Sequence, residues 1–468
     1  MKKLLLFIFT VIFSPTLTNA QDIVGSWNGT LKINDKMQLR LVLNITQTDG
    51  GYKSTLDSPD QGVKGIPATK TTFNDGILKF EVPSAKIVYT GTLKDGKFIG
   101  TFTQNNNDLP LELVKGGIVV ETPKRPQEPQ KPFPYYSEDV TFTNTTANIM
   151  LAGTLTLPQK EGKFPVVILI SGSGPQNRDE ELFSHKPFLV ISDYLTRNGI
   201  AVLRFDDRGV GQSKGNFKSA TSLDHASDVE SALAYLKTRK EIKQIGLIGH
   251  SEGGLIAPIV AAKNKDVAFI VMLAGTGISG EKLLPIQQEL ISKATGVSEK
   301  DILTTKEISE ATFKIIVENE DDEKIRTGLT DYFKNRLKTY PDEKPKDISD
   351  EAYATGMAKQ SMNPWPWMKF FLKYDPATSL VKVKCPVLAL NGDKDLQVPA
   401  QINLSNIEKA LKKGRNKDIT IKAYKDLNHL FQESVTGNPV EYRTIEQTFS
   451  PLVLEDMSKW IKSKTGLK

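Results

Sequence analysis

The segment that decides the fold is residues 245–254, which read IGLIGHSEGG. Its first four residues are typical of a buried strand, and the apolar residues that follow Gly254 predict a helix. Between them lies the pattern Gly249-x-Ser251-x-Gly253, in which small residues on either side of the serine let the backbone crowd into a sharp turn. A strand, this turn and a helix together expose a serine oxygen above the sheet. Ser251 is therefore the candidate nucleophile.

A serine hydroxyl needs a general base, and the chain has only 4 histidines. His250 adjoins the nucleophile on so tight a turn that we expect it to point elsewhere. His185 and His225 come before Ser251, whereas the partners of such a serine follow it in the order acid, then histidine. Position and elimination therefore both favour His429 as the base.

The acid that orients the base should leave the strand before the one that delivers the histidine. The apolar run 386–390 leads into a loop that holds Asp393 and Asp395. Asp395 is the first choice because it lies far enough past the strand end to reach back toward the base. Asp393 is the alternative, and its simpler role is to cap the turn.

Two backbone amides are expected to stabilise an oxyanion. One is the amide of Glu252, directly after the nucleophile and at the start of a helix. The other should come from the loop at 171–175, which reads SGSGP and follows an apolar strand. The amide of Ser173 is the best candidate there, although a plain glycine turn would explain the same residues.

Strands and helices alternate around this segment. Apolar runs at 165–170, 200–205, 267–273, 386–390 and 419–424 predict strands, and helical patterns separate most of them. Such alternation is typical of a mostly parallel sheet with right-handed crossovers and helices on both faces. Ligands of these sheets bind beyond the carboxyl ends of the strands.

Residues 278–380 interrupt the alternation with a charged stretch of helical pattern. A connection this long needs structure of its own, so we predict a helical cap over the strand ends. Aromatic and methionine side chains crowd into its last part, residues 362–374. We expect Trp365 and Trp367 to bind substrate as a wall of the acyl pocket, with an ordinary core between cap and sheet as the alternative.

Three segments precede the sheet. The first has two lysines and then an apolar run too short to span a membrane, which is typical of a cleaved signal peptide and predicts export to a periplasm or the medium without a stable membrane anchor. The second alternates apolar and polar residues between Asp-Gly turn pairs and predicts an antiparallel β domain. The third holds five prolines and predicts an extended linker. The expected division is signal peptide 1–20, β domain 21–117, linker 118–134, catalytic domain 135–277 and 381–468, and cap 278–380.

Three motifs taken together resemble a known group of proteins. They are SGSGP at 171–175, DRGVGQS at 207–213 and GHSEGG at 249–254. In this order they look like the α/β-hydrolase esterases and the serine aminopeptidase-like hydrolases, over roughly residues 135–465. The resemblance implies the α/β-hydrolase fold and the following site: Ser251, Asp395 and His429 as a triad, with Ser173 and Glu252 as amide donors.

Three further points follow from the same resemblance. The Asp-Arg-Gly stretch has a structural role in such proteins, with Arg208 and an acidic neighbour bracing a loop. The loop at 171–175 begins with Ser171 where many relatives have histidine, which leaves the second amide donor open. A small β domain before the catalytic domain resembles an arrangement found in some bacterial esterases.

Composition excludes several other functions. The net charge of +6 is too weak in a chain of 468 residues to indicate nucleic-acid binding. Cys385 is the only cysteine, so no intramolecular disulfide forms, and it reads as a buried structural thiol. The sequence contains no metalloprotease motif, phosphate loop or dinucleotide fingerprint, so we expect no metal and no cofactor.

Three functions remain. Hydrolysis of a small-molecule carboxylic ester is the leading hypothesis. A serine exopeptidase is the second, and it would need acidic side chains in the cap, such as those at 318–323, to hold a free amine. A binding protein with a catalytically silent hydrolase domain is the third.

Overall fold

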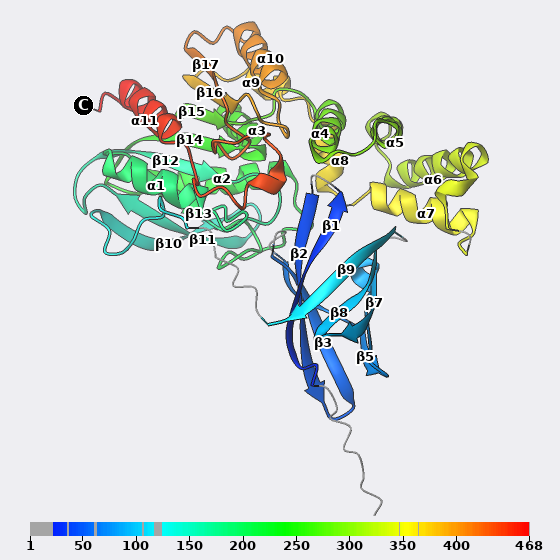
Figure 1. Ribbon diagram of the computed structural model, residues 1–468. Coiled ribbons are helices and arrows are strands. Elements are labelled where there is room, and N and C mark those ends of the chain that lie inside the picture. Colours follow the sequence, from blue (N-terminus) through cyan, green and yellow to red (C-terminus); the bar gives the residue numbers. More distant parts are fainter. Residues whose placement is uncertain are drawn as a thin grey trace, which may run out of the picture. The chain divides into compact units, whose positions relative to one another are not determined.

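The structure is a computed structural model that describes residues 22–34, 37–59, 63–104, 107–116, 124–345, 347–363 and 365–467. The chain divides into two compact units, Met1–Val120 and Glu121–Lys468. The expected signal peptide and the first part of the expected linker lie outside the described residues. Figure 1 labels the elements of both units.

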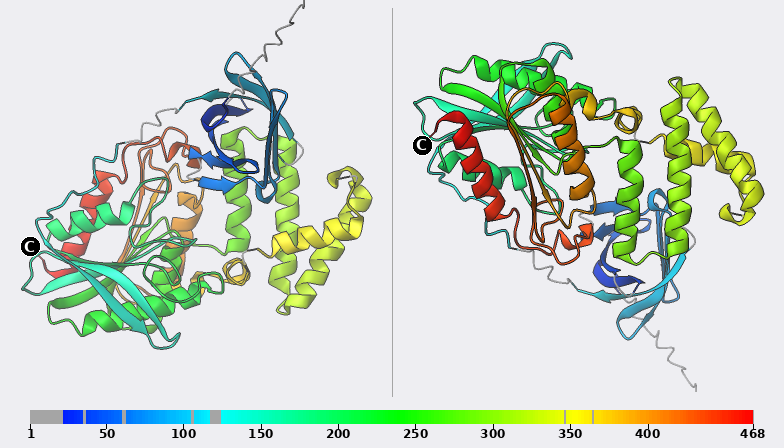
Figure 2. Two further views of the ribbon diagram at one scale, coloured as in Figure 1. Left: turned by 90° about the horizontal axis from the view of Figure 1, so that it is seen from below. Right: turned by 90° about the horizontal axis from the view of Figure 1, so that it is seen from above.

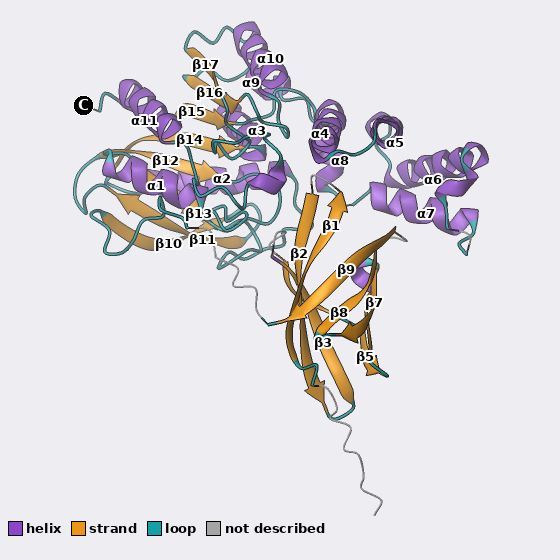
Figure 3. Cartoon of the chain, viewed as in Figure 1, coloured by secondary structure: helices purple, strands orange, loops and turns teal. Residues whose placement is uncertain are grey.

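The first unit is built from strands in an antiparallel sheet, drawn in orange in Figure 3. Their order in the sheet is β4-β3-β2-β1-β9-β8-β7-β6-β5, so most neighbours in the sheet are also neighbours in the chain. The strands are β1 Gly25–Asn34, β2 Met37–Thr48, β3 Gly51–Ser58, β4 Val63–Pro67, β5 Lys70–Asn74, β6 Ile77–Val82, β7 Ile87–Lys94, β8 Lys97–Gln104 and β9 Asn107–Lys115.

Turn chemistry sets the register of this sheet. Asp75-Gly76 and Asp95-Gly96 both have positive φ at the two turn positions, the conformation that suits a tight hairpin. Burial alternates along β7, so one face packs inward around large side chains such as Trp27 and Phe98. Ser54 in β3 bonds Thr71 in β5 at 2.8 Å, and the sheet therefore curls back on itself.

The second unit is organised around a mixed sheet of order β10-β11-β13-β12-β14-β15-β16-β17. Strands from β12 onward pair in parallel, whereas β11 pairs antiparallel with both β10 and β13. The strands are β10 Tyr136–Asn144, β11 Ile149–Leu157, β12 Phe164–Ile170, β13 Ala201–Phe205, β14 Ile242–His250, β15 Val267–Leu273, β16 Val387–Gly392 and β17 Ile419–Tyr424.

Helices cover both faces of this sheet, as Figure 2 shows from two sides. Along β12, Val166 and Ile168 join the core under α2, α3 and α10, whereas Val167 and Leu169 join the core under α1 and α11. A strand that is buried on both faces reads as a continuous apolar run, which explains why the sequence revealed it. These helices are α1 Pro187–Arg197, α2 Ser222–Lys237, α3 Glu252–Lys263, α10 Ala400–Lys413 and α11 Pro451–Thr465.

An insertion between β15 and β16 is helical throughout its regular parts. Its helices are α4 Gly280–Thr295, α5 Glu299–Glu318, α6 Asp322–Thr339, α7 Asp350–Ser361, α8 Trp367–Lys373 and α9 Ala377–Leu380. A small apolar cluster of its own, which includes Phe313, Leu329 and Leu372, holds α5, α6 and α8 together. No helix in the described ranges combines the length and the apolar character needed to cross a bilayer.

The described part of the proline-rich segment, from residue 124, lies against the second unit. The Arg125 guanidinium donates to four backbone carbonyl oxygens in residues 183–184 and 443–445. The Gln127 side chain makes three hydrogen bonds to the backbone of residues 448–449. Arg125 and Gln127 therefore form a clamp on the loops at residues 183–184 and 443–449 of the second unit.

Candidate active site

Ser251 stands on a strained turn between β14 and α3. Its φ of 53° and ψ of −115° lie outside the conformations that side chains ordinarily allow, as expected of a nucleophile on a tight elbow. A Cβ at Gly249 would lie 2.0 Å from the carbonyl oxygen of Gly253, and one at Gly253 would lie 2.1 Å from that of Ile170. Both glycines of the motif are therefore required by contact with neighbouring backbone.

His429 and Asp395 are brought together from loops after β17 and β16. The Nδ1 atom of His429 lies 2.7 Å from Oδ2 of Asp395, and both side chains are buried. The other carboxylate oxygen of Asp395 accepts hydrogen bonds from the amides of Gln397 and Val398, each at 2.8 Å. Because every one of these bonds is short, the carboxylate is held in one orientation toward the imidazole.

Asp393 has a different position. Its Oδ1 atom accepts a hydrogen bond of 2.7 Å from the backbone amide of Asp426, next to the turn that follows β17. Its contact is therefore a turn cap, whereas the carboxylate that reaches His429 belongs to Asp395.

The other three histidines have separate surroundings. Burial lowers the pKa of His185 and of His225 to about 4. His185 is hydrogen-bonded to Thr448, to the carbonyl oxygen of Tyr442 and to the side chain of Gln432. Both ring nitrogens of His250 have partners, Glu180 at Nδ1 and the carbonyl oxygen of His429 at Nε2, and its ring centroid lies 4.9 Å from that of His429. His429 differs from His250 because its Nδ1 atom meets Asp395 while no described residue bonds its Nε2 atom.

The loop after β12 passes directly over the elbow. A Cβ at Gly172 would lie 3.2 Å from Cβ of Ser251, so a larger residue there would crowd the serine. Asp207 anchors the loop by accepting hydrogen bonds from the Ser171 hydroxyl and the Gln176 amide, and burial raises the pKa of this carboxyl to about 8.

Backbone amides differ in their availability around Ser251. The Gly172 amide donates to Oε1 of Glu180 at 2.7 Å and is therefore occupied. Within the described ranges no hydrogen bond engages the amide of Ser173 or that of Glu252. The sequence named the same two amides as candidates.

The two tryptophans of the insertion lie in different places. The indole nitrogen of Trp367 donates to Oε1 of Glu252 at 2.8 Å, and its ring stacks on Phe371 with centroids 5.0 Å apart. The indole nitrogen of Trp365 donates instead to Asp322 in α6, at an exposed position. Only Trp367 therefore contacts the residue that follows the nucleophile.

Glu252 has a buried carboxyl group, and burial raises its pKa. Its Oε1 atom accepts from Trp367 and also from the Ser222 hydroxyl at 2.6 Å. The carboxyl group thus joins α8 of the insertion to the start of α2 and to the elbow.

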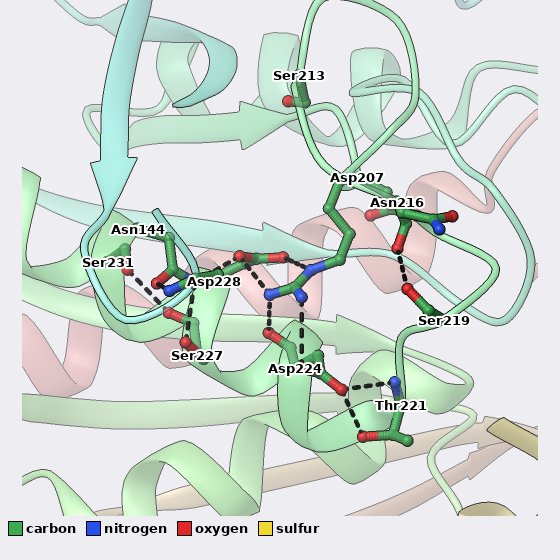
Figure 4. Close-up of polar contacts among 12 residues, drawn as sticks. Asn144, Asp207, Ser213, Asn216, Ser219, Thr221, Asp224, Ser227, Asp228 and Ser231 are labelled. Atoms are coloured by element: carbon green, nitrogen blue, oxygen red, sulfur yellow. Dashed lines mark hydrogen bonds and ion pairs between the residues drawn. The ribbon is translucent and has the colours of Figure 1, made fainter. Parts of the chain in front are cut away.

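Arg208 braces the neighbouring loop. Its guanidinium donates to both carboxylate oxygens of Asp228, at 2.7 and 2.9 Å, and to the carbonyl oxygen of Asp224. Asn144 donates to the same carboxylate at 2.7 Å, as Figure 4 shows. The structural role that the resemblance implied for Arg208 agrees with this network.

Sequence reasoning missed three contacts at this site. Glu180 has no motif, Ser222 is one of many serines at a helix start, and the partners of His250 lie 70 and 179 residues away in the chain. No local pattern could have identified them.

Across the described ranges, no three potential ligands among His, Cys, Asp and Glu gather as a metal site would require.

Several known proteins are similar to parts of this chain. Residues 187–327 match the family described as "Serine aminopeptidase, S33". Esterase EstD of Thermotoga maritima is 24% identical over 315 residues, which are 66% of this chain and 65% of that protein. The chain therefore spans just under two thirds of that relative. An uncharacterised 31.7 kDa protein of Escherichia coli is 26% identical over 54% of this chain and 79% of its own length.

Two solved structures of esterases align with this chain at low sequence identity. The Pyrococcus furiosus esterase Pf2001 is 17% identical, over 71% of this chain and 91% of that one, with a TM-score of 0.39. Est1E from Butyrivibrio proteoclasticus is 17% identical, over 70% of this chain and 99% of that one, with a TM-score of 0.38. Part of the chain is therefore similar to Esterase EstD, and its residues 187–327 resemble the serine aminopeptidase S33 family.

Proposed function

We propose that the chain is an exported serine hydrolase that cleaves carboxylic esters through Ser251, His429 and Asp395. The observation that carries this proposal is the pair of His429 and Asp395, joined at 2.7 Å and buried beside the strained turn of Ser251. Nothing in ordinary packing requires a serine at a backbone conformation that favours glycine. The strain has a reason if the hydroxyl must stand clear of the sheet.

Acylation uses the three side chains in sequence. His429 takes the proton of the Ser251 hydroxyl at Nε2 while the serine oxygen bonds to the ester carbonyl carbon. The negative oxygen that forms lies between the amides of Ser173 and Glu252, which have no other acceptor in the described ranges. His429 then returns the proton to the leaving alcohol, and the acyl group remains on Ser251.

Deacylation repeats these steps with water. His429 removes a proton from a water molecule, whose oxygen attacks the acyl carbonyl carbon, and the same two amides stabilise the second oxyanion. The proton returns to the oxygen of Ser251 as the carboxylic acid leaves. Asp395 holds the imidazole in the tautomer that keeps Nδ1 protonated throughout.

A serine exopeptidase is the second candidate, because the matched family is described as a serine aminopeptidase. The acidic side chains of the insertion that it would use have partners in the structure. Glu320 pairs with Lys373, and Asp322 pairs with Lys369. These pairs leave less negative charge for a substrate amine, and they favour the ester as substrate.

Two substrates and one label test these alternatives. We expect the chain to hydrolyse p-nitrophenyl butyrate, to leave an aminoacyl-anilide nearly untouched, and to take up a fluorophosphonate on Ser251. The reverse substrate ranking would establish the exopeptidase. Failure of both substrates and of the label would leave a binding protein.

The insertion is proposed as a cap that lines the acyl pocket, with Trp367 as the residue that contacts the acyl chain of the substrate. Trp367→Ala should change the preference between short and long acyl esters by roughly 1–3 kcal/mol, because a wall aromatic is lost beside the elbow. Trp365→Ala is the matched control, since its indole bonds Asp322. The measurements are kcat/KM across a chain-length series and the melting temperature.

An unchanged substrate ranking in Trp367→Ala, together with a lower melting temperature, would make this residue part of the core only. A larger change of ranking in Trp365→Ala than in Trp367→Ala would place the pocket nearer α6.

Two deletions compare the contribution of the antiparallel β domain, residues 21–117, with that of the clamp formed by Arg125 and Gln127. We expect removal of residues 21–117 to keep turnover of a small soluble ester within about 3-fold, because that unit supplies no proposed catalytic group. A chain that starts at residue 135 should unfold at lower urea concentration, because it loses the hydrogen bonds of both clamp residues. Equal urea midpoints for the two shortened chains would contradict this.

Export remains a proposal that rests on residues 1–20. If it is correct, expression in a bacterial host should yield a chain that begins at Gln21 in the periplasm or the medium. N-terminal sequencing of the mature chain decides the question.

A further inference from the structure

Glu180 and His250 form a buried polar pair that the proposed mechanism does not use. The Glu180 carboxylate lies 2.9 Å from Nδ1 of His250, and both side chains are almost completely buried. Apolar side chains, among them Phe188, Leu273 and Phe449, surround the two groups. A charged pair in such surroundings loses its hydration, which costs free energy. The presence of this pair in the interior therefore calls for a specific reason.

The backbone conformation of Glu180 is also unusual. Its φ of 50° lies in the left-handed region, which residues other than glycine rarely adopt. This conformation turns the carboxylate inward, where Oε1 accepts the Gly172 amide at 2.7 Å as well as His250. Glu180 therefore holds the loop after β12 at the point where it crosses Ser251.

His250 makes its second hydrogen bond to the loop that carries the base. Its Nε2 atom lies 3.0 Å from the backbone carbonyl oxygen of His429. A carbonyl oxygen only accepts, so Nε2 of His250 must donate, and Nδ1 must donate as well if Glu180 is ionised. Burial disfavours the imidazolium, but the charge and hydrogen bond of Glu180 outweigh it and raise the pKa of His250.

We propose that Glu180 and His250 are positioning residues that hold the loop after β12 and the loop of His429 at a fixed separation across Ser251. This inference rests on the proposed function. The chain of contacts runs from the Gly172 amide through Glu180 and His250 to the carbonyl oxygen of His429. The contact at Gly172 fixes the position of the neighbouring Ser173 amide, and the contact at the His429 carbonyl oxygen fixes the position of the imidazole of His429.

Two substitutions of His250 test the contact with His429. Glutamine places an amide nitrogen near the position of Nε2 and keeps the donor to His429, whereas asparagine places it near Nδ1 and keeps only the donor to Glu180. We expect His250→Asn to lower kcat for p-nitrophenyl butyrate by about 10- to 100-fold with little change in KM, because a small displacement of the base slows proton transfer. His250→Gln should stay within about 5-fold of the parent.

Substitutions of Glu180 test the other end of the pair. Both the Gly172 amide and His250 meet Oε1 of Glu180, so Glu180→Gln keeps an acceptor oxygen for them and loses only the negative charge. It should therefore restore part of the activity that Glu180→Ala loses. Thr156→Val is the control for stability alone, because it removes a buried hydroxyl that bonds Ser192 and Thr196 in α1 rather than the His429 loop. It should lower the melting temperature and leave kcat at 25 °C within about 3-fold.

The outcomes separate the two proposals. A parent chain that takes no fluorophosphonate label and cleaves no ester overturns the proposed function, and this inference with it. An active parent whose His250→Asn and His250→Gln variants have equal kcat values overturns the positioning role alone. Variants that melt earlier yet turn over normally show that the pair serves stability only.

Discussion

Ser251→Ala is expected to lower kcat for p-nitrophenyl esters by roughly 10⁴-fold or more while the fold stays intact. Removal of the hydroxyl leaves no oxygen to form the acyl-enzyme, whereas the two oxyanion amides and the cap remain in place. An alanine also fits the same turn, because the conformation is imposed by the glycines on either side. His429→Ala should have an effect of the same order, since the hydroxyl then has no base.

The measurements are kcat, the rate of fluorophosphonate labelling and the melting temperature. Ser219→Ala, at an exposed serine of a surface loop, serves as the matched control and should behave as the parent. Turnover of either triad variant near that of the parent would refute the assignment of the nucleophile or the base.

Asp395→Asn is expected to have the second largest effect, a loss of about 10³- to 10⁴-fold in kcat. The carboxylate accepts from Nδ1 of His429 and from two backbone amides. An amide in its place can turn its NH₂ group toward Nδ1, which favours the tautomer with the proton on Nε2. The imidazole then cannot accept the serine proton.

Asp393→Asn is the matched control for the acid. Its carboxylate accepts only the amide of Asp426 among the contacts described, and asparagine keeps an acceptor oxygen. We expect kcat within about 3-fold of the parent. If Asp393→Asn is the more damaging of the two substitutions, the acid of the triad has to be reassigned.

Much of the second unit could be predicted from sequence, because its central strands are buried on both faces. Runs such as 165–170 and 267–273 are apolar throughout, and the structure places strands over them. β10 and β11 were not identified individually. β10 alternates buried and exposed residues, so it lacks the continuous apolar signal. β11 is buried along most of its length, but Gly153, Thr154 and Thr156 interrupt its apolar run.

The proline-rich segment illustrates a different limit. Its composition predicts a solvated linker, because such residues build no core. Arg125 nevertheless binds carbonyl oxygens more than 300 positions later in the chain. A guanidinium recognises any carbonyl oxygens that a loop presents, so nothing in the local pattern could reveal these partners.

Sequence by itself determined the residues whose roles depend on local backbone geometry. The turn at Ser251 needs glycines at fixed spacing because neighbouring carbonyl oxygens lie where a Cβ would be, and this requirement is written in consecutive residues. The order of acid and histidine after the serine follows from the order of parallel strands. Both the glycine spacing and the order of the acid and the histidine can be read directly from the sequence.

Only the tertiary structure decided which side chains meet across the sheet ends. It joined Asp395 rather than Asp393 to His429, placed Trp367 rather than Trp365 on Glu252, and paired Glu180 with His250. Each of these choices depends on how loops from separate strands fold back over one edge of the sheet. A hydrogen bond is formed within about 3 Å, and spacing along the chain does not determine distances on that scale.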